Sequence, residues 1–485
     1  MITNLRELTA LSPFLILIAS VVIVILSISH NRNHFLIAML STFALIATFF
    51  SLYLLISIVP INIANLFYVT KYSILYISII LISGISSCVF SYEWLSRYEF
   101  NKEEFYLLLL LSTIGAMCLT ISSHMSSIFI SIELMSLPMF GLIAYSNYVD
   151  YTLEASFKYL ILSAISSVFL LLGIAWIYAI SGNLSVAYIN HIFLFVSNNE
   201  KLVLLFGMIM VLVSFLFKLS LVPFHLWTSD IYQGTPSSIL SFFSVSGKVA
   251  LFSVLLHIFS YNSLISNQAL YLILSLISIF SILFGNFMAI FQNNIKRFFG
   301  YSSISQLGYL LSILIMLKNN YAFSLETVVI YLLNYLFINI AYFGVIQLLS
   351  NSSNDIDSIS FYKGLFWSKP ILSGVLTIVL LSLAGLPITL GFIGKFYILS
   401  MIIQNNLWLM SVSFIFGTIL GLYGYFRLII NLYLKPAKQS LNYKKFASNI
   451  YSNIFSEILI LLSGFMLLVF GLFPNPLIYL INFTK

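Results

Sequence analysis

The 485-residue chain is 61% hydrophobic and only 7% charged, and its mean hydropathy is +1.07. Such a chain lacks the polar residues needed to cover a water-soluble globule, which excludes the soluble fold classes and indicates an integral membrane protein. Its net charge of +7 gives no support to a nucleic-acid partner, since the basic residues are scattered over loops and helices. The two cysteines, Cys88 and Cys118, lie in separate apolar segments, so neither a disulfide framework nor a CxxC metal site is expected.

Apolar runs of about 20 residues, the length that crosses about 30 Å of hydrocarbon, follow one another along the whole chain. The first run has no basic leader or small-residue cleavage site, so we interpret it as a retained helix. The sequence predicts an all-α membrane protein of about fourteen spans, near residues 9–29, 35–57, 73–92, 104–122, 124–148, 153–181, 202–229, 237–258, 269–291, 295–316, 321–348, 370–404, 408–433 and 452–480. The longest polar stretches, 91–103, 349–369 and 435–451, are predicted to be loops.

Basic residues distinguish the two faces of the predicted bundle. Eleven lie in loops on one side, Lys296 and Arg297 among them, and five lie on the other. The positive-inside rule then places both termini on the outer face. Five basic residues remain within the predicted helices: Lys158, Lys218, Lys248, Lys395 and Arg427.

Two apolar runs are interrupted in a similar way. In FLFKLSLVPFHLWTSD (215–230), Pro223 follows Lys218, and in SLAGLPITLGFIGKFYIL (382–399), Pro387 and three glycines precede or flank Lys395. Proline breaks a helix, and unwound backbone at membrane depth is tolerated only where it lines protein or a water-filled cavity. The interruptions fall in predicted helices seven and twelve, five helices apart, so the two units must cross the membrane in opposite senses.

That spacing predicts two inverted five-helix repeats, helices 4–8 and 9–13, a pattern typical of transporters. The expected organisation is an N-terminal three-helix unit (1–100), a first repeat (101–260), a second repeat (261–434), and a C-terminal loop with helix 14 (435–485).

Ionisable residues at membrane depth are functional candidates, because each needs a partner or water to offset desolvation. Among the acidic residues, only Glu133 falls well inside a predicted span. Burial disfavours the charged form of lysine and of glutamate, whereas an opposite charge nearby favours it, so a Glu/Lys pair that separates can release a proton. Some of the basic residues have simpler interpretations. Lys158 lies near a helix start and could snorkel to the surface, and Arg427 fits a structural charge near a boundary.

Three stretches resemble a known family: KLSLVPFHLWTSDIYQGTPSSILSFFSVSGKVALF (218–252), NIKRFFGYSSISQLGYLL (294–311) and LAGLPITLGFIGKFYIL (383–399). They are similar to subunit 2 of the proton-pumping NADH dehydrogenase, respiratory complex I, called chain N in bacteria. The resemblance implies an antiporter-like proton-pumping subunit with fourteen helices in two inverted repeats. It also implies neighbouring antiporter-like and other membrane-arm subunits as partners, together with phospholipids. NADH, FMN, iron–sulfur clusters and ubiquinone would be bound in other subunits, and this chain would hold no cofactor or metal itself.

The resemblance assigns roles position by position. Glu133 matches the family's helix-five glutamate and Lys218 its partner lysine on helix seven. Lys248 matches the helix-eight lysine and Lys395 the helix-twelve lysine of the proton relay. His225 and Lys158 match a histidine near the first break and a helix-six lysine, both possible members of the relay. His225 could instead cap unwound backbone.

One residue departs from the family pattern. Gln306 stands where many relatives have histidine, and an amide can bond water but carries no proton charge, so a histidine relay is not expected there.

The sequence also bears on three other classes of function. A bis-histidine haem carrier needs histidine pairs on facing helices, yet only His225 lies near mid-membrane. The large subunit of a multisubunit cation/proton antiporter shares the implied fold and lysines and stays as the alternative. A purely structural membrane protein would not keep five basic residues buried. The chain lacks an amphipathic Arg-rich presequence and is rich in Ile, Phe, Asn and Tyr, as in AT-rich genomes, which favours the mitochondrial inner membrane, with the bacterial plasma membrane as the alternative.

Overall fold

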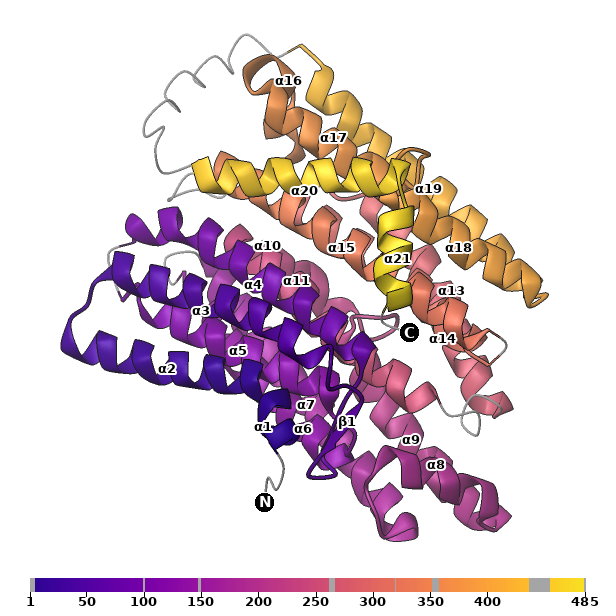
Figure 1. Ribbon diagram of the computed structural model, residues 1–485. Coiled ribbons are helices and arrows are strands. Elements are labelled where there is room, and N and C mark those ends of the chain that lie inside the picture. The colour runs from indigo at the N-terminus through magenta and orange to yellow at the C-terminus, as the bar shows by residue number, and fades with distance from the viewer. Residues whose placement is uncertain are drawn as a thin grey trace.

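The computed structural model describes residues 5–98, 101–146, 150–260, 267–318, 320–350, 357–435 and 454–483. Within these ranges the chain is almost entirely helical, and the helices run roughly side by side in one elongated bundle (Figure 1). The first part of the chain forms one block of the bundle and the last part the other, and α20 contacts both α15 and α4 where the blocks meet.

Thirteen helices in the described ranges are long and apolar enough to cross a membrane. They are α2 (Ser12–His30), α3 (His34–Leu55), α4 (Lys71–Ser96), α5 (Glu104–Ile121), α6 (Met125–Ile143), α7 (Asp150–Ser181), α9 (Asn198–Lys218), α11 (Ser237–Phe259), α13 (Gln268–Ile290), α14 (Ile295–Met316), α15 (Tyr321–Leu349), α19 (Trp408–Tyr433) and α20 (Ile454–Leu472). The short apolar helices α17 (Pro370–Ala384) and α18 (Leu390–Gln404) lie within the predicted span 370–404. The expected all-α, multi-pass membrane protein is therefore confirmed.

Both expected interruptions are present. The seventh span is α9 followed by α10 (Leu226–Gly234), and the twelfth is α17 followed by α18. At the first break the chain leaves helical geometry directly after Lys218, and Ser220 takes a positive φ of 58°. At the second break, Gly385 ends α17 with φ 78°. Glycine carries no Cβ and adopts this left-handed conformation without steric cost.

Several smaller elements were not predicted: α1 (Leu5–Ala10), the hairpin β1 (Ile61–Ile63) and β2 (Phe67–Val69), α8 (Val186–Phe195), η1 (Ile359–Tyr362), α16 (Leu365–Ser368) and α21 (Asn475–Phe483). The last predicted span, 452–480, was too long. α20 ends at Leu472, just before Pro474, and α21 begins after it. The polar stretch 91–103 is only partly a loop, because α4 continues to Ser96. Most of the predicted 435–451 loop lies outside the described residues.

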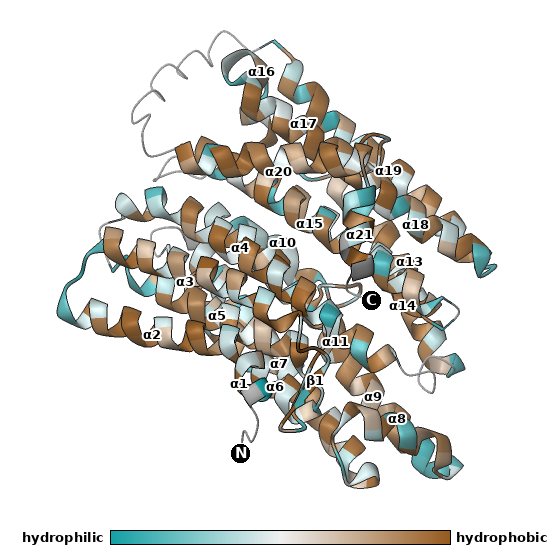
Figure 2. Cartoon of the chain, viewed as in Figure 1, coloured by the Kyte–Doolittle hydropathy of each residue, from teal (hydrophilic) through white to brown (hydrophobic). Residues whose placement is uncertain are grey.

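Burial separates central helices from peripheral ones. In α11 and α14, 94% of the membrane-crossing window is buried by other parts of the chain, and in α15 the share is 89%, whereas in α2 and α20 it is 28%. Apolar residues dominate the helices and polar residues gather at helix ends and connections (Figure 2). Side chains on α11, α14 and α15 are therefore shielded from lipid, which makes these helices suitable carriers of buried polar groups.

Candidate functional site

Lys218 lies at the first helix break and is 5% exposed. Its ammonium group donates a hydrogen bond to the Ser163 hydroxyl of α7 and lies 5.9 Å from the ring centre of Tyr159 on the same helix. The lysine therefore points into the bundle and does not snorkel to the membrane surface.

Side chains satisfy part of the unwound backbone around Lys218. The Val222 amide donates to Ser281 Oγ of α13 at 3.1 Å, and the indole of Trp227 donates to the Phe217 carbonyl at 3.2 Å. His225 is 6% exposed and packs edge-on against Phe284, with ring centres 4.6 Å apart. The two hydrogen bonds give partners to a backbone amide and a backbone carbonyl at the break, and unwound backbone at membrane depth needs such partners.

Glu133 on α6 faces the same region without touching Lys218. No ion pair within 4.0 Å joins the two residues, so the direct contact expected from the family pattern is absent between these described side chains. The Lys218 ammonium is directed to Ser163 instead, while Glu133 acts on it electrostatically from a longer distance. One Glu133 oxygen accepts from Ser136 Oγ at 3.4 Å, and the other is buried with no hydrogen-bond partner among the described residues.

A small cavity separates Lys218 from Lys248. Both lysines line it, together with Tyr159, Trp227 and other, mostly apolar, residues, and its volume is about 20 Å³. A buried water needs roughly 10–15 Å³ of such space and two or more polar partners. The cavity therefore has room for about one water.

Lys248 lies on α11, whose membrane-crossing window is 94% buried, and is 3% exposed. Its ammonium group donates three hydrogen bonds: to Tyr232 OH of α10 at 2.9 Å, to Ser303 Oγ of α14 at 3.0 Å and to Tyr335 OH of α15 at 3.0 Å. An ammonium has three donors, so all of them are used by neutral hydroxyls. The three partners come from both predicted repeats, and Lys248 thereby joins them.

Gln306 lies on α14 one helical turn beyond Ser303. Its carbonyl oxygen accepts a hydrogen bond from Tyr331 OH, and its amide nitrogen donates to Tyr425 OH at 3.4 Å. One turn further, the Tyr309 hydroxyl accepts from the Asn286 amide at 3.1 Å. The polar side chains described between Lys248 and Lys395 therefore carry hydroxyl and amide groups.

Lys395 on α18 reaches back across the second break. Its ammonium donates to the carbonyls of Leu383, at 2.6 Å, and Ala384, at 3.2 Å, which end α17, and it lies 5.2 Å from the ring centre of Tyr309. The carbonyl end of a helix carries partial negative charge and stabilises a cation. Gly385 makes the approach possible, because a Cβ at that position would lie 2.6 Å from Lys395 Cδ.

Lys158 does not reach the buried lysines. Its side chain is 40% exposed and forms ion pairs with Glu154 at 2.6 Å and with Asp230 of α10 at 2.7 Å. Asp230 also pairs with Arg297 of α14 at 3.1 Å. Lys158 therefore belongs to a charge cluster at the end of the bundle where α10 and α14 meet.

Arg427 has a structural position, in line with its interpretation from the sequence as a structural charge near a helix boundary. Its guanidinium donates to the Ile290 carbonyl, the last of α13, at 2.7 Å and to Asn293 Oδ1 at 3.1 Å. It satisfies a helix end and lies away from the lysine line.

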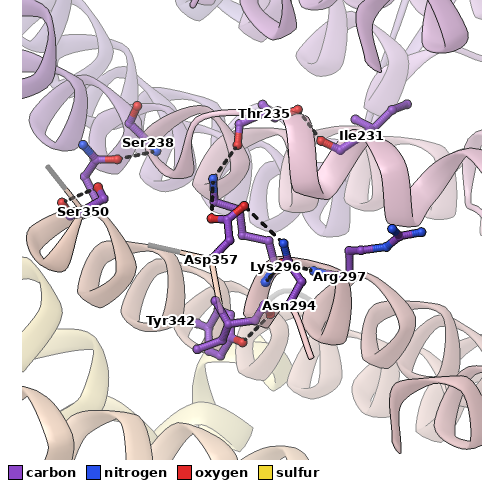
Figure 3. Close-up of polar contacts among 11 residues, drawn as sticks. Ile231, Thr235, Ser238, Asn294, Lys296, Arg297, Tyr342, Ser350 and Asp357 are labelled. Carbon is purple, nitrogen blue, oxygen red and sulfur yellow. Dashed lines mark hydrogen bonds and ion pairs between the residues drawn. The ribbon is translucent and has the colours of Figure 1, made fainter. Parts of the chain in front are cut away.

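Sequence reasoning missed a second charged pair near the α10–α14 end. Lys296, placed in a loop by the hydropathy pattern, is fully buried in the first turn of α14 and pairs with Asp357 at 3.3 Å. Asp357 also accepts from the Asn294 amide at 3.2 Å, and Lys296 donates to the Thr235 carbonyl at 3.3 Å (Figure 3). The Asn294 side chain caps α14, and this cap agrees with the predicted span 295–316 in starting the helix before the two basic residues.

The family described as NADH:quinone oxidoreductase/Mrp antiporter, TM matches residues 122–421, a stretch that contains Glu133, Lys218, Lys248 and Lys395. A protein named NADH-quinone oxidoreductase subunit N from Buchnera aphidicola subsp. Schizaphis graminum is 66% identical over 99% of both chains. The chain belongs to the family of NADH-quinone oxidoreductase subunit N.

Further relatives agree with this membership. A protein of the same name from Buchnera aphidicola subsp. Acyrthosiphon pisum is 58% identical over the full length of both chains. A chain of respiratory complex I from Thermus thermophilus superposes with a TM-score of 0.80 and 25% identity, over 96% of this chain and 97% of that one. A chain of the Mrp complex from Dietzia sp. superposes with a TM-score of 0.85 at 16% identity, over 99% and 97% of the two chains, which shows a shared fold alone.

Proposed function

We propose that this chain is a proton-translocating membrane-arm subunit of NADH:ubiquinone oxidoreductase, respiratory complex I. Two relatives that match over nearly their whole length carry the name NADH-quinone oxidoreductase subunit N. Its partners are the other membrane-arm subunits, neighbouring antiporter-like subunits among them, and the surrounding phospholipids. The flavin, the iron–sulfur clusters and the sites for NADH and ubiquinone belong to other subunits of the complex. Likeness to the Mrp antiporter chain is confined to the fold, so the antiporter alternative gains no comparable support.

The relatives also bear on location. Both come from Buchnera, a bacterium, so the mitochondrial assignment expected from composition gains no support. The chain crosses a membrane many times. We place it in a bacterial plasma membrane, the alternative named above, and base compositions of AT-rich bacterial genomes account for its richness in Ile, Phe, Asn and Tyr.

The mechanism rests on one observation, which is that polar and ionisable side chains follow one another inside the bundle. Glu133 acts on Lys218, a cavity joins Lys218 to Lys248, and tyrosine hydroxyls with Gln306 fill the interval to Lys395. We assign the proton relay to these four ionisable residues. His225 and Lys158 take no part as carriers in this proposal, because His225 packs at the helix break and Lys158 is held in partly exposed ion pairs.

Each carrier has a different local environment. Lys218 is balanced by a distant carboxylate and one hydroxyl, whereas Lys248 is surrounded by three hydroxyls and Lys395 by helix-end carbonyls. An opposite charge nearby stabilises a charged lysine, and withdrawal of that charge favours proton release. A proton arriving on Lys248 would thus weaken the hold of the protein on a proton at Lys218, which lines the same cavity.

The placement of the two helix breaks supports the predicted repeats, 101–260 and 261–434, as functional halves. Each half has a lysine beside its break. In the first half Lys218 ends α9, before the break, and in the second half Lys395 lies on α18, after the break. Lys248 then bridges the halves through its three hydroxyl partners.

Replacing Lys218 tests the proposal. Lys218→Met keeps the length and the apolar contacts but removes the titrating group, so the complex should assemble and lose most of its NADH-driven proton pumping and coupled quinone reductase activity. Lys218→Arg should be nearly as harmful, since guanidinium does not release its proton in proteins. The matched control is Lys363→Met, which removes an exposed lysine. Normal pumping by an assembled Lys218→Met complex, judged by native gel, would exclude Lys218 as a carrier.

A further inference from the structure

Lys296 is a buried charge that the relay of four residues does not use. It is 0% exposed, lies in the first turn of α14, and pairs at 3.3 Å with Asp357, whose side chain is 21% exposed (Figure 3). Removing an ammonium group from water is costly, and replacing a buried ion pair by apolar residues is often neutral or stabilising. The pair is therefore weak evidence of a contribution to stability, and fixing how helices align is the best-attested use of such buried groups.

The Lys296 ammonium group connects two separate parts of the chain at the start of α14. It donates to the carbonyl of Thr235, which directly follows α10, at 3.3 Å, and it pairs with Asp357. Asp357 is itself attached to α14, because its carbonyl accepts from the Ile295 amide at 2.7 Å and its carboxylate accepts from the Asn294 side chain at 3.2 Å. We call the Lys296–Asp357 pair the α14 clamp, since it fastens the end of α10 to the start of α14.

One face of α14 runs from the clamp to Lys248. Lys296, Gly300 and Ser303 are four and three residues apart, so they are neighbours on one face of the helix. Gly300 lies against α10, because a Cβ at this position would be 3.4 Å from Tyr232 Cβ. Ser303 accepts a hydrogen bond from Lys248 at 3.0 Å. The same face therefore contacts the end of α10, the Tyr232 side chain and the Lys248 ammonium group.

Tyr232 links the position of α10 to Lys248. Its side chain is fully buried, and its hydroxyl accepts from the Lys248 ammonium group at 2.9 Å. Tyr232 lies three residues before Thr235, which is less than one helical turn, so a displacement of the end of α10 also moves Tyr232. Such hydrogen bonds need about 2.7–3.2 Å between heavy atoms, so a displacement of about 1 Å would break this one.

We propose that Lys296 is a positioning residue of the relay. By holding the end of α10 it sets where that helix lies on α14, and it thereby keeps the Tyr232 hydroxyl against Lys248. Lys296 carries no proton in this scheme, and it does not line the cavity that Lys218 and Lys248 share. The inference rests on the proposed function, because Lys248 is one of the proposed proton carriers.

A second ion pair between the same two helices provides a matched control. Arg297 of α14 pairs with Asp230 of α10 at 3.1 Å, but the two side chains are 35% and 32% exposed, so water screens the pair. Asp230→Asn removes this pair and leaves the clamp in place. It should pump nearly as well as the parent.

A double-mutant cycle with Tyr232 tests the proposal. The clamp variant combines Lys296→Met, which keeps the length of the side chain, with Asp357→Asn, which removes the matching negative charge and keeps an acceptor for Asn294. Tyr232→Phe removes only the hydroxyl. NADH-driven proton pumping is measured for the parent complex, the clamp variant, Tyr232→Phe and the chain that combines all three substitutions, after native gels have shown assembly.

We expect the clamp variant and Tyr232→Phe each to lower pumping by about tenfold, the effect of losing one hydrogen bond to a charged group. The combined chain should pump as well as Tyr232→Phe alone, because the clamp acts through a hydroxyl that is already gone. A merely structural role would lower pumping further in the Tyr232→Phe background, since independent effects add. Additive losses, or unchanged pumping by the clamp variant, would overturn the positioning role.

A single substitution covers the case in which the clamp variant does not assemble. Asp357→Asn alone leaves Lys296 without its charged anchor, so it should lower pumping by roughly threefold in the parent and not at all in the Tyr232→Phe background. Equal losses in both backgrounds would overturn the proposal. A loss in Asp230→Asn as large as that in the clamp variant would overturn the assignment to Lys296.

The outcomes also separate this inference from the proposed function. If Lys218→Met abolishes pumping while the clamp variant leaves it unchanged, the positioning role is overturned and the relay stands. If neither Lys218→Met nor Tyr232→Phe lowers pumping, the relay is overturned and the positioning role with it.

Discussion

Gly385→Ala should uncouple the second half of the relay through the position of a single methyl group. Gly385 ends α17 with φ 78°, and its absent Cβ leaves space for Lys395. An L-residue held in left-handed geometry costs about 1–2 kcal/mol. The new Cβ would also lie 2.6 Å from Lys395 Cδ, closer than real contacts allow, so the lysine chain must shift.

The shift removes hydrogen bonds that orient the Lys395 ammonium. It donates to the carbonyls of Leu383 and Ala384, and a hydrogen bond to a charged group is worth about 1.5–3 kcal/mol. Loss of one of these bonds at the proton-transfer step corresponds to roughly a tenfold slower step or more. We therefore expect pumping to fall by about tenfold.

The assay is NADH-driven acidification of inverted membrane vesicles, with quinone reductase activity measured in parallel. Gly374→Ala is the matched control, because it lies in the same helix and its Cβ would meet nothing within 4 Å. Equal pumping by the two alanine variants would refute the claim that the close approach at Gly385 holds Lys395 in its working position.

Two further substitutions separate the relay from its surroundings. Tyr335→Phe removes one of three hydroxyls that hold Lys248, so pumping should fall by about tenfold while the ring packing is kept; unchanged pumping would mean that the hydroxyl does not orient the lysine. Asp230→Asn removes the charge shared by Lys158 and Arg297, and because these pairs are about one-third exposed, each contributes only about 0–1 kcal/mol. It should lower the temperature of half-inactivation slightly and leave pumping near that of the parent, and an assembled variant without pumping would place Asp230 in the relay.

The sequence predicts the spans and both breaks because membrane crossing imposes a length and an apolar composition on each helix. Lys218 and Lys395 were recognisable for the same reason, since a lysine in an apolar run beside a proline is costly unless it has a use. The short hairpin β1–β2 and the helix α8 escaped notice because neither is long enough to produce a clear periodic pattern.

The partners of the lysines were not predictable. Ser163 lies 55 positions from Lys218, and Tyr335 lies 87 positions from Lys248. Serine and tyrosine are frequent in this chain, and no local signal marks the few hydroxyls that meet an ammonium group after packing. Glu133 illustrates the same limit, because the family resemblance implied a contact with Lys218, whereas in the structure the Lys218 ammonium donates to Ser163 of α7.

The most direct test of the relay is a high-resolution cryo-EM map of the assembled complex in lipid, with ordered waters resolved. The account predicts a continuous line of waters and polar side chains from Glu133 through Lys218, Lys248 and Gln306 to Lys395, with a water in the cavity between Lys218 and Lys248. A Lys218 side chain that points toward lipid headgroups, or a dry apolar gap between Lys248 and Lys395, would contradict it.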